Sequence, residues 1–155
     1  MEAKQALDAL LAGNNRFVAS KLAHPNSDAP ARAALVANQK PFAIIISCSD
    51  SRVSPNILFD QGLGDLFEIR LAGNVASEFA IESIEYAIEH LGPKLILVMS
   101  HSNCGAVTAC FESKGSSNAY KNLMLEISPA VEENNTLEGA IIANAKNTAK
   151  KLATV

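Results

Sequence analysis

Three short apolar runs, separated by longer stretches with helical periodicity, constrain the fold of this chain more than any other feature. The runs are Phe-Ala-Ile-Ile-Ile at 42–46, Leu-Phe-Glu-Ile-Arg at 66–70 and Leu-Ile-Leu-Val-Met at 95–99. Each has the length and residue types of a strand, and the third is apolar enough for burial on both faces. Strands that alternate with helices predict a three-layer α/β fold, in which helices flank a central, mostly parallel β-sheet.

The clearest helical pattern spans residues 77–91, where Ser77 is a candidate N-cap and Gly92 follows the last turn. Its apolar residues form one stripe that should face the core, namely Ile81, Ile84, Ile88 and Leu91. Further helices are expected over about 2–20 and 31–38, from Pro55, over about 104–111 and over most of 119–153, with a break at Ser128 and Pro129 and a Gly/Ser loop at 114–118.

Composition and charge argue against several classes of partner. The 155 residues fit one domain, and the net charge of −3 offers no attraction to nucleic acid or to an anionic membrane. The longest apolar stretches are too short to cross a bilayer, and the N-terminus lacks the apolar run of a secretory signal. We therefore expect a cytoplasmic protein, in which cysteines bind metal or act in catalysis more often than they form disulfides.

Two pairs of potential metal ligands follow the first and third predicted strands. Cys48 and Asp50 come after the first, and His101 and Cys104 come after the third. Because the carboxyl ends of parallel strands form the usual ligand-binding edge of an open α/β sheet, both pairs can meet at one ion. Two thiolates, an imidazole and a carboxylate suit tetrahedral Zn²⁺ better than they suit calcium, magnesium or an iron–sulfur cluster. The predicted cofactor is zinc.

Each of these residues, taken alone, has a simpler structural interpretation. A buried cysteine is often a small core residue, and Asp50 can form a turn. Only the joint arrangement of the four favours a metal site. Cys110 has no such partner pattern and is interpreted as a core residue, and His24 and His90 are interpreted as surface or structural residues.

Arg52 lies two residues after Asp50, so both side chains can point to the same side of an extended loop. A guanidinium group can hold a carboxylate through two parallel hydrogen bonds. The simple interpretation of this pair is a structural salt bridge. The alternative is a carboxylate held in position to orient a metal-bound water.

Two pentapeptides, Cys-Ser-Asp-Ser-Arg at 48–52 and His-Ser-Asn-Cys-Gly at 101–105, resemble the two zinc motifs of the β-class carbonic anhydrases. The segments 59–75 and 83–92 resemble the same family, and the likeness extends from Leu10 to about residue 150. The resemblance implies zinc-dependent, reversible hydration of carbon dioxide to bicarbonate and a proton, carried out by a zinc-bound hydroxide.

The same resemblance implies roles for individual residues. Cys48, His101 and Cys104 would be permanent zinc ligands. Asp50 would either bind zinc or pair with Arg52 as a catalytic dyad and leave the fourth position to water, so activity should be greater at alkaline than at acidic pH. The positions that match the family's substrate pocket are Gln39, Phe67, Ala72, Tyr86 and Gly105, and Gln39 would donate a hydrogen bond to a substrate oxygen.

The resemblance also implies how the chain is organised. We expect a single domain over 1–155, with a helical arm over about 1–38 that extends onto a partner subunit and a zinc-binding core over about 39–155. Family members are homodimers or larger homo-oligomers, and we expect the C-terminal edge strand into which they commonly continue to be missing from this sequence. Ser100 stands where the family usually has Gly before the ligand His. Some members have a bicarbonate-regulated site that uses a Trp together with the equivalent of Arg70. This chain has Ile45 in place of that Trp, so we do not expect that regulation.

Three alternative functions remain open at this point. The same scaffold can hydrolyse carbonyl sulfide or carbon disulfide, which are linear cumulenes like carbon dioxide. A catalytically inactive zinc-binding structural module would bind zinc without hydrating carbon dioxide. A nucleotide-binding α/β protein ranks last, because no Gly-rich phosphate loop follows the first predicted strand.

Overall fold

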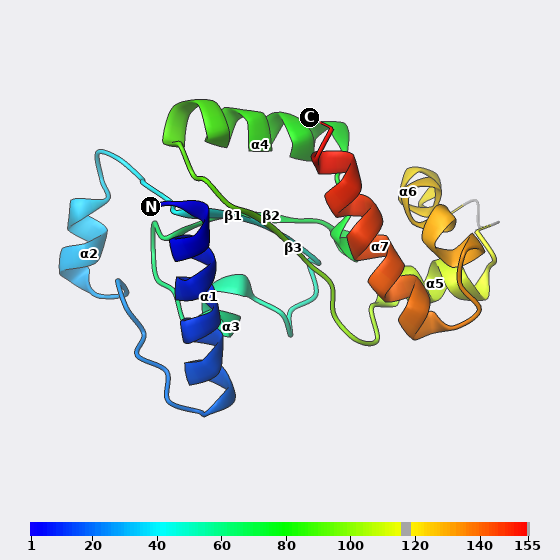
Figure 1. The fold of residues 1–155 in the computed structure, drawn as a ribbon, viewed down its shortest axis with the longest axis horizontal. Coiled ribbons are helices and arrows are strands. Elements are labelled where there is room, and N and C mark those ends of the chain that lie inside the picture. The colour runs from blue at the N-terminus through cyan, green and yellow to red at the C-terminus, as the bar shows by residue number, and fades with distance from the viewer. Residues whose placement is uncertain (116–118, 155) are drawn as a thin grey trace. The chain divides into compact units, whose positions relative to one another are not determined.

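A central parallel sheet forms from the three predicted strands. The computed structural model describes residues 1–115 and 119–154. Strands β1 (Ala43–Ser47), β2 (Leu66–Arg70) and β3 (Ile96–Met99) lie in the order β2-β1-β3, with helical segments connecting them (Figure 1). The predicted α/β class is confirmed, and each strand lies within one residue of its predicted position.

Burial differs between the central strand and the two outer strands. All five residues of β1 are buried, because β1 has a neighbouring strand on each side. Every residue of β3 is only half-buried, as is every residue of β2. The prediction that the 95–99 run is buried on both faces is therefore wrong. An apolar run of this kind does not distinguish a central strand from an outer one.

The helices largely follow the predicted pattern. Helix α1 spans Ala3–Val18, and α2 spans Ala29–Ala34, two residues before its predicted start, because the Asp28 carboxylate caps the N–H of Ala31 at 2.9 Å. The other helical elements are α3 (Pro55–Leu58), the 3₁₀ turn η1 (Ala72–Asn74), α4 (Glu78–Leu91), α5 (Gly105–Glu112), α6 (Lys121–Glu132) and α7 (Leu137–Leu152). Within 1–115 and 119–154, no helix combines the length and apolar character needed to cross a membrane. The predicted 114–118 loop lies partly outside the described residues.

Helix α4 begins and ends as predicted, and its buried face agrees with the predicted one in part. The Ser77 hydroxyl accepts a hydrogen bond from the N–H of Ala80 at 3.3 Å, and Gly92 follows the last turn with a φ of 73°. The buried positions are Ala80, Ile84 and Ala87, whereas Ile88 is 47% exposed. Of the predicted stripe, Ile84 is buried, Ile81 and Leu91 are half-buried, and the prediction is wrong for Ile88. The small residues Ala80 and Ala87 lie on either side of Ile84 on the inward face.

The predicted break at Ser128 and Pro129 is also wrong, because Pro129 lies inside α6. Proline lacks the N–H that would bond to the carbonyl of Leu125. The Ser128 hydroxyl donates a hydrogen bond to that carbonyl at 3.4 Å instead. The helix continues to Glu132, and the break falls just before Thr136, which caps α7 through the N–H of Gly139 at 3.1 Å.

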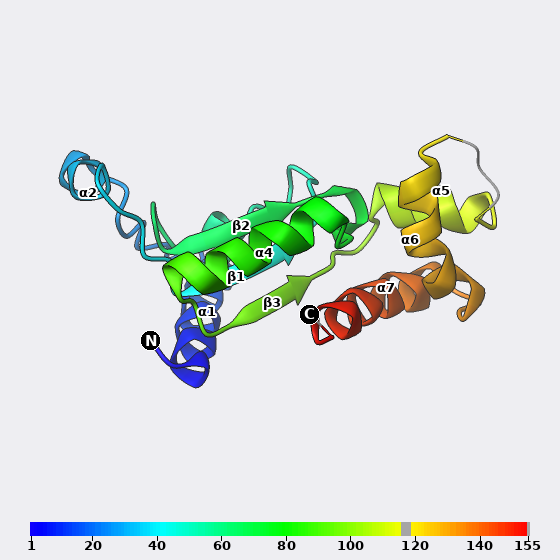
Figure 2. The same ribbon diagram turned by 90° about the horizontal axis from the view of Figure 1, so that it is seen from above.

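The chain divides into two compact units. The first comprises Met1–Ile45, Arg52–Ile69 and Glu82–Leu97, and the second comprises Ile46–Ser51, Arg70–Ile81 and Val98–Val155. In the first unit, α4 runs along one face of the strands and α1 lies on the other (Figures 1 and 2). Its core includes Leu10, Ile44 and Ile84, each no more than 1% exposed. The single domain with an N-terminal arm over about 1–38 stays a prediction.

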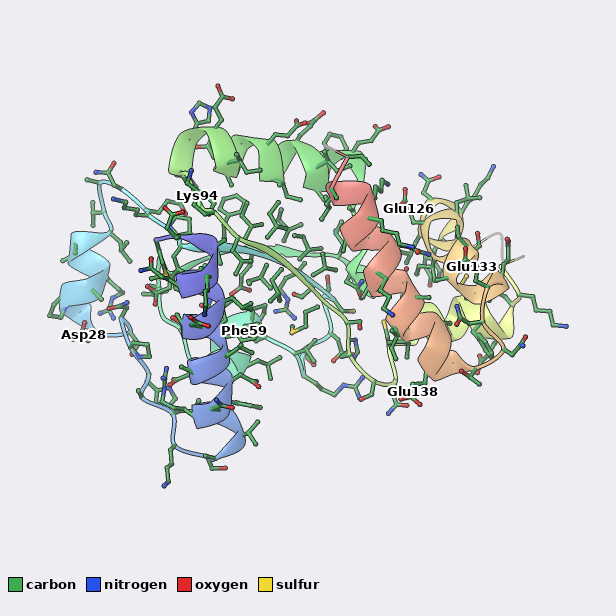
Figure 3. All side chains as sticks on the ribbon, in the orientation of Figure 1. Asp28, Phe59, Lys94, Glu126, Glu133 and Glu138 are labelled. Carbon is green, nitrogen blue, oxygen red and sulfur yellow. The ribbon has the colours of Figure 1, made fainter. Side chains whose placement is uncertain are left out.

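The second unit contains the ends of the strands and a cluster of helices. Helices α5, α6 and α7 pack against one another and against η1. The buried amide of Asn144 on α7 donates a 2.6 Å hydrogen bond to the carbonyl of Gly73 in η1. Glu126 of α6 accepts a hydrogen bond from the ammonium group of Lys151 of α7 at 2.8 Å, and Glu133 and Glu138 are exposed (Figure 3).

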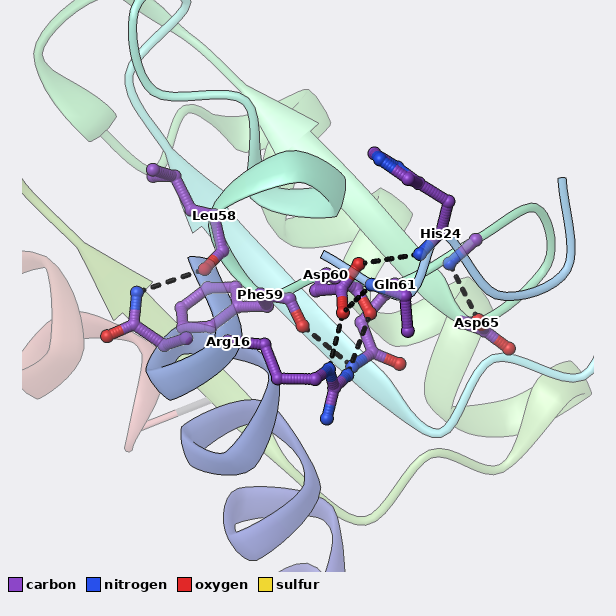
Figure 4. A network of polar contacts seen from close by, with 10 residues as sticks. Arg16, His24, Leu58, Phe59, Asp60, Gln61 and Asp65 are labelled. Atoms are coloured by element: carbon purple, nitrogen blue, oxygen red, sulfur yellow. Dashed lines mark hydrogen bonds and ion pairs between the residues drawn. The ribbon is translucent and has the colours of Figure 1, made fainter. Parts of the chain in front are cut away.

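A buried carboxylate ties together two loops of the first unit. Asp60, 2% exposed, accepts hydrogen bonds from the N–H groups of Ala23 at 2.9 Å and His24 at 3.0 Å and from the guanidinium of Arg16 (Figure 4). The Ala23 N–H bond, with further contributions from Arg16 and His24, lowers the pKa of Asp60 from 3.8 to about 2, although burial opposes the shift. Because the folded-state pKa is depressed, the ionised carboxylate stabilises the fold above about pH 4, and this contribution disappears as the pH falls to about 2.

We predict that Asp60→Asn lowers the melting temperature at pH 7 by about 5 °C, because the amide keeps the shape but loses the charge that Arg16 and the two N–H groups bind. The difference from the unmodified protein should shrink toward about pH 2, where Asp60 is protonated. Circular dichroism melts at both pH values measure this. Asp8→Asn, at an exposed ion pair with Lys4, is the control and should change little. An equal loss at both pH values would contradict the assignment.

Candidate metal centre

Three potential metal ligands converge in the second unit, as the sequence predicts. Cys48 directly follows β1, His101 follows β3 after Ser100, and Cys104 immediately precedes α5. Their candidate ligand atoms all lie within 4.8 Å of one another, and the two sulfur atoms are 3.9 Å apart. Parallel strands bring the first two residues to the same edge of the sheet, and the start of α5 brings the third.

His101 has the environment of a metal ligand. Its side chain is 8% exposed, and Nδ1 lies 2.9 Å from the carbonyl oxygen of Ser102. Donation from Nδ1–H to that carbonyl selects the tautomer in which Nε2 carries a lone pair. In the described part of the chain Nε2 is buried and has no hydrogen-bond partner. A buried nitrogen of this kind, close to two thiols, fits a metal ion that accepts its lone pair.

The two thiols are buried beside each other. Burial raises the pKa of the Cys104 thiol, and the nearby Cys48 raises it further. Bringing two thiolates together in such a place requires a positive charge to compensate them, which a divalent cation supplies. Two sulfurs and one imidazole nitrogen are the donors that zinc prefers over hard, oxygen-seeking cations. The residues therefore fit zinc.

Asp50 lies beside this cluster. Its side chain is 19% exposed, and Oδ2 is 3.8 Å from Nε2 of His101. That separation places the carboxylate next to the imidazole of His101. Arg52 is exposed and belongs to the first unit, so its pairing with Asp50 stays a prediction.

The residues predicted for the substrate pocket are distributed over both units. Gln39, Phe67 and Tyr86 belong to the first, and Ala72 and Gly105 belong to the second. In the first unit, Gln39 lines a cavity of about 320 Å³, and Tyr86 is 52% exposed with its ring 4.8 Å from that of His90. In the second, Ala72 lines a cavity of about 660 Å³ and Gly105 opens α5. The shared substrate pocket stays a prediction.

Other residues interpreted from the sequence lie where expected. Cys110 is fully buried in α5, with Sγ 3.8 Å from the carbonyl oxygen of Met124, as a core residue should be. His24 and His90 are exposed.

Two features of the site escaped sequence reasoning. Arg70, noted only for a regulated site that we did not expect, donates hydrogen bonds to the carbonyls of Cys48 and Asp50. Its place at the end of the strand beside β1 was the available signal. The start of α7 also contributes, because Glu138 and Ile141 line a cavity of about 600 Å³ together with His101.

Comparison with known proteins identifies close relatives. A family model described as carbonic anhydrase matches residues 43–155. Carbonic anhydrase 2 of Mycobacterium tuberculosis is 51% identical over 104 residues, which cover 67% of this chain and 50% of the relative. Carbonic anhydrase of Mycolicibacterium smegmatis is 42% identical over 130 residues, covering 81% of this chain and 63% of the relative.

The fold has solved counterparts as well. The structure of the β-carbonic anhydrase CcaA is similar over 97% of this chain and 75% of that one, with a TM-score of 0.71 and 27% identity. The chain spans about half the length of the M. tuberculosis relative that it matches.

Proposed function

Because this chain belongs to the β-class carbonic anhydrases, we propose that it catalyses the reversible hydration of carbon dioxide to bicarbonate and a proton. The observation that carries this proposal is the buried cluster of Cys48, His101 and Cys104, in which Nε2 of His101 has no hydrogen-bond partner among the described residues. We assign these three residues as the ligands of a catalytic zinc ion.

A zinc ion held at such a site would lower the pKa of a coordinated water to near neutral pH. The chain's own contribution is to hold the ion and to orient its surroundings. The Ser102 carbonyl orients the imidazole of His101 through Nδ1. Burial of both thiols limits access of bulk water to the sulfurs.

We assign Asp50 as a conditional ligand. Its carboxylate lies 3.8 Å from Nε2 of His101, so it would either join the three ligands in holding the ion or leave a place for water. Arg52, two residues further along the chain, is proposed to draw the carboxylate away and hold it as a hydrogen-bond acceptor for the attacking water. Activity then requires an ionised Asp50 paired with Arg52 and should be greater at alkaline than at acidic pH.

We also propose the remaining components from the family. Gln39, Phe67, Ala72, Tyr86 and Gly105 would line the substrate pocket. Assembly into a homo-oligomer is supported by the tetrameric β-carbonic anhydrases of Sordaria macrospora, whose structures this chain resembles.

A cytoplasmic location suits the site, because the three cysteines are free and the two proposed ligands among them, Cys48 and Cys104, must stay reduced.

The decisive test is stopped-flow hydration of carbon dioxide by the full chain after its zinc content has been measured. We expect zinc-loaded protein to accelerate hydration at least about 1,000-fold over buffer, and chelator-treated protein to lose the acceleration until zinc is restored. The rate should rise between about pH 6.5 and about pH 9, since the water ionises in this range. A flat profile would contradict both the ionisation of the water in this range and the proposed gating by Asp50 and Arg52.

Zinc-loaded protein without any hydration activity would refute the proposed reaction. Assays with carbonyl sulfide and carbon disulfide then distinguish the hydrolase alternative from an inactive zinc-binding module. The inactive module also predicts that Arg52→Ala changes nothing in these assays, whereas the proposed dyad predicts a loss of hydration activity.

A further inference from the structure

The side chain of Arg70 reaches from the end of β2 to the loop that carries Cys48 and Asp50. Its Nε donates a hydrogen bond to the carbonyl oxygen of Cys48 at 3.2 Å. Its Nη2 donates to the same oxygen at 3.1 Å and to the carbonyl oxygen of Asp50 at 2.7 Å. One guanidinium therefore joins the backbone of the first metal ligand to that of the conditional ligand.

The backbone of residues 70 and 71 also forms hydrogen bonds with this loop. The Ser49 hydroxyl donates to the carbonyl of Arg70 at 2.9 Å, and the Ser49 N–H donates to the carbonyl of Leu71 at 3.3 Å. The N–H of Leu71 donates to the carbonyl of Ser47 at 3.1 Å. Residues 47–50 are thus bound to residues 70–71 by side-chain and backbone hydrogen bonds, all within the second unit.

Arginine suits this position for a geometric reason. Its planar group presents several N–H donors in fixed directions, so it can satisfy two carbonyl oxygens two residues apart at the same time. A lysine ammonium at the end of a flexible stem can reach one of them but does not fix their relative orientation. Without these donors the loop can adopt more conformations, and metal binding must then order it.

We propose that Arg70 is a positioning residue for the metal centre: by binding the carbonyls of Cys48 and Asp50, it fixes the direction in which both side chains leave the loop. The proposal rests on the proposed function only for the identity of the ion, because the hydrogen bonds themselves do not depend on the reaction. It predicts that loss of the guanidinium weakens and distorts metal binding in a chain that is still folded.

The test uses the full chain with Arg70→Met, Arg70→Lys and Ser49→Ala, and with Arg32→Met as the matched control at an exposed arginine of α2. Zinc affinity is measured by competition with a chromophoric chelator. The visible spectrum of the Co²⁺-substituted protein reports the geometry of the thiolate ligands, and circular dichroism melts of the metal-free proteins report folding.

We expect Arg70→Met to weaken zinc binding about 10- to 100-fold and to shift the Co²⁺ bands. Arg70→Lys should recover part of the affinity, Ser49→Ala should have a smaller effect in the same direction, and Arg32→Met should match the unmodified protein. If Arg70→Met does not fold, the affinity and spectrum of Arg70→Lys decide the question.

Unchanged zinc affinity and an unchanged Co²⁺ spectrum in folded Arg70 variants would overturn the proposal, as would an equal loss of affinity in Arg32→Met. These outcomes are distinct from failure of the proposed function. Unmodified protein that binds zinc tightly but does not hydrate carbon dioxide would refute the reaction and leave the role of Arg70 to be judged by metal binding alone.

Discussion

Replacing Cys104 with serine is expected to weaken zinc binding by about 100-fold or more and to reduce carbon dioxide hydration to the buffer background. The cluster supplies two sulfurs and one nitrogen within 4.8 Å, so removal of one thiol leaves two strong ligands. A serine hydroxyl does not ionise near neutral pH and is a poor replacement for a thiolate. The loss should therefore appear in metal content before it appears in any property of the fold.

The matched control for this variant is Cys110→Ser. Both thiols are fully buried, burial raises the pKa of each, and they lie six residues apart in the chain. Cys110 contacts the carbonyl of Met124 instead of the cluster, so its replacement should leave zinc binding intact. Zinc content and affinity are measured for both variants at one fixed pH, because metal must displace a proton from each ligand thiol. Retention of full affinity by Cys104→Ser, or an equal loss in Cys110→Ser, would contradict the ligand assignment.

Gly13→Ala is expected to destabilise the protein by about 3 kcal/mol and to lower its melting temperature by about 10 °C. Gly13 lies in α1, and a Cβ atom at this position would lie 1.7 Å from the carbonyl oxygen and 2.6 Å from the carbonyl carbon of Phe59, which follows α3. Those are backbone atoms, so relief of the clash requires the helix or the Phe59 backbone to shift. The substitution therefore opposes the packing of α1 against α3 within the first unit.

Gly105→Ala serves as the control for the effect of a methyl group on a helical glycine. Apart from its chain neighbours and the backbone of α5, no atom of the described residues lies within 4 Å of a Cβ at Gly105, the first residue of α5. Because alanine favours helix by about 1 kcal/mol over glycine, this variant should melt at the same temperature or slightly higher. Thermal melts are the measurement for both, since Gly105 also belongs to the proposed substrate pocket. A Gly13→Ala protein as stable as the unmodified chain would show that α1 does not pack as closely as the structure has it.

Local patterns in the chain were enough to predict the class of fold and to name candidate metal ligands that the fold brings together. The 42–46, 66–70 and 95–99 runs predicted the three strands to within one residue, because strand length and residue type are local properties. The position of Cys48, Asp50, His101 and Cys104 just after two strands made all four candidate ligands, because parallel topology brings such loops together. The resemblance to the β-class carbonic anhydrases then singled out Cys48, His101 and Cys104, whose ligand atoms lie within 4.8 Å of one another. The three side chains lie close together because β1 and β3 are neighbours in the sheet and because Cys104 follows His101 by only three positions along the chain.

Tertiary packing decided what these patterns leave open. The apolar 95–99 run became a half-buried outer strand, since its exposure depends on its neighbours in the sheet. Gly13 should weaken a helix by propensity alone, yet the approach of Phe59 leaves no room for a side chain there. Arg70 lies far from Cys48 in sequence and contacts it only because β2 and β1 are neighbours. The sequence by itself indicated which residues are candidates to bind a metal ion, whereas contacts between distant segments decided how the loop of Cys48 and Asp50 is held and where the fold has room for a side chain.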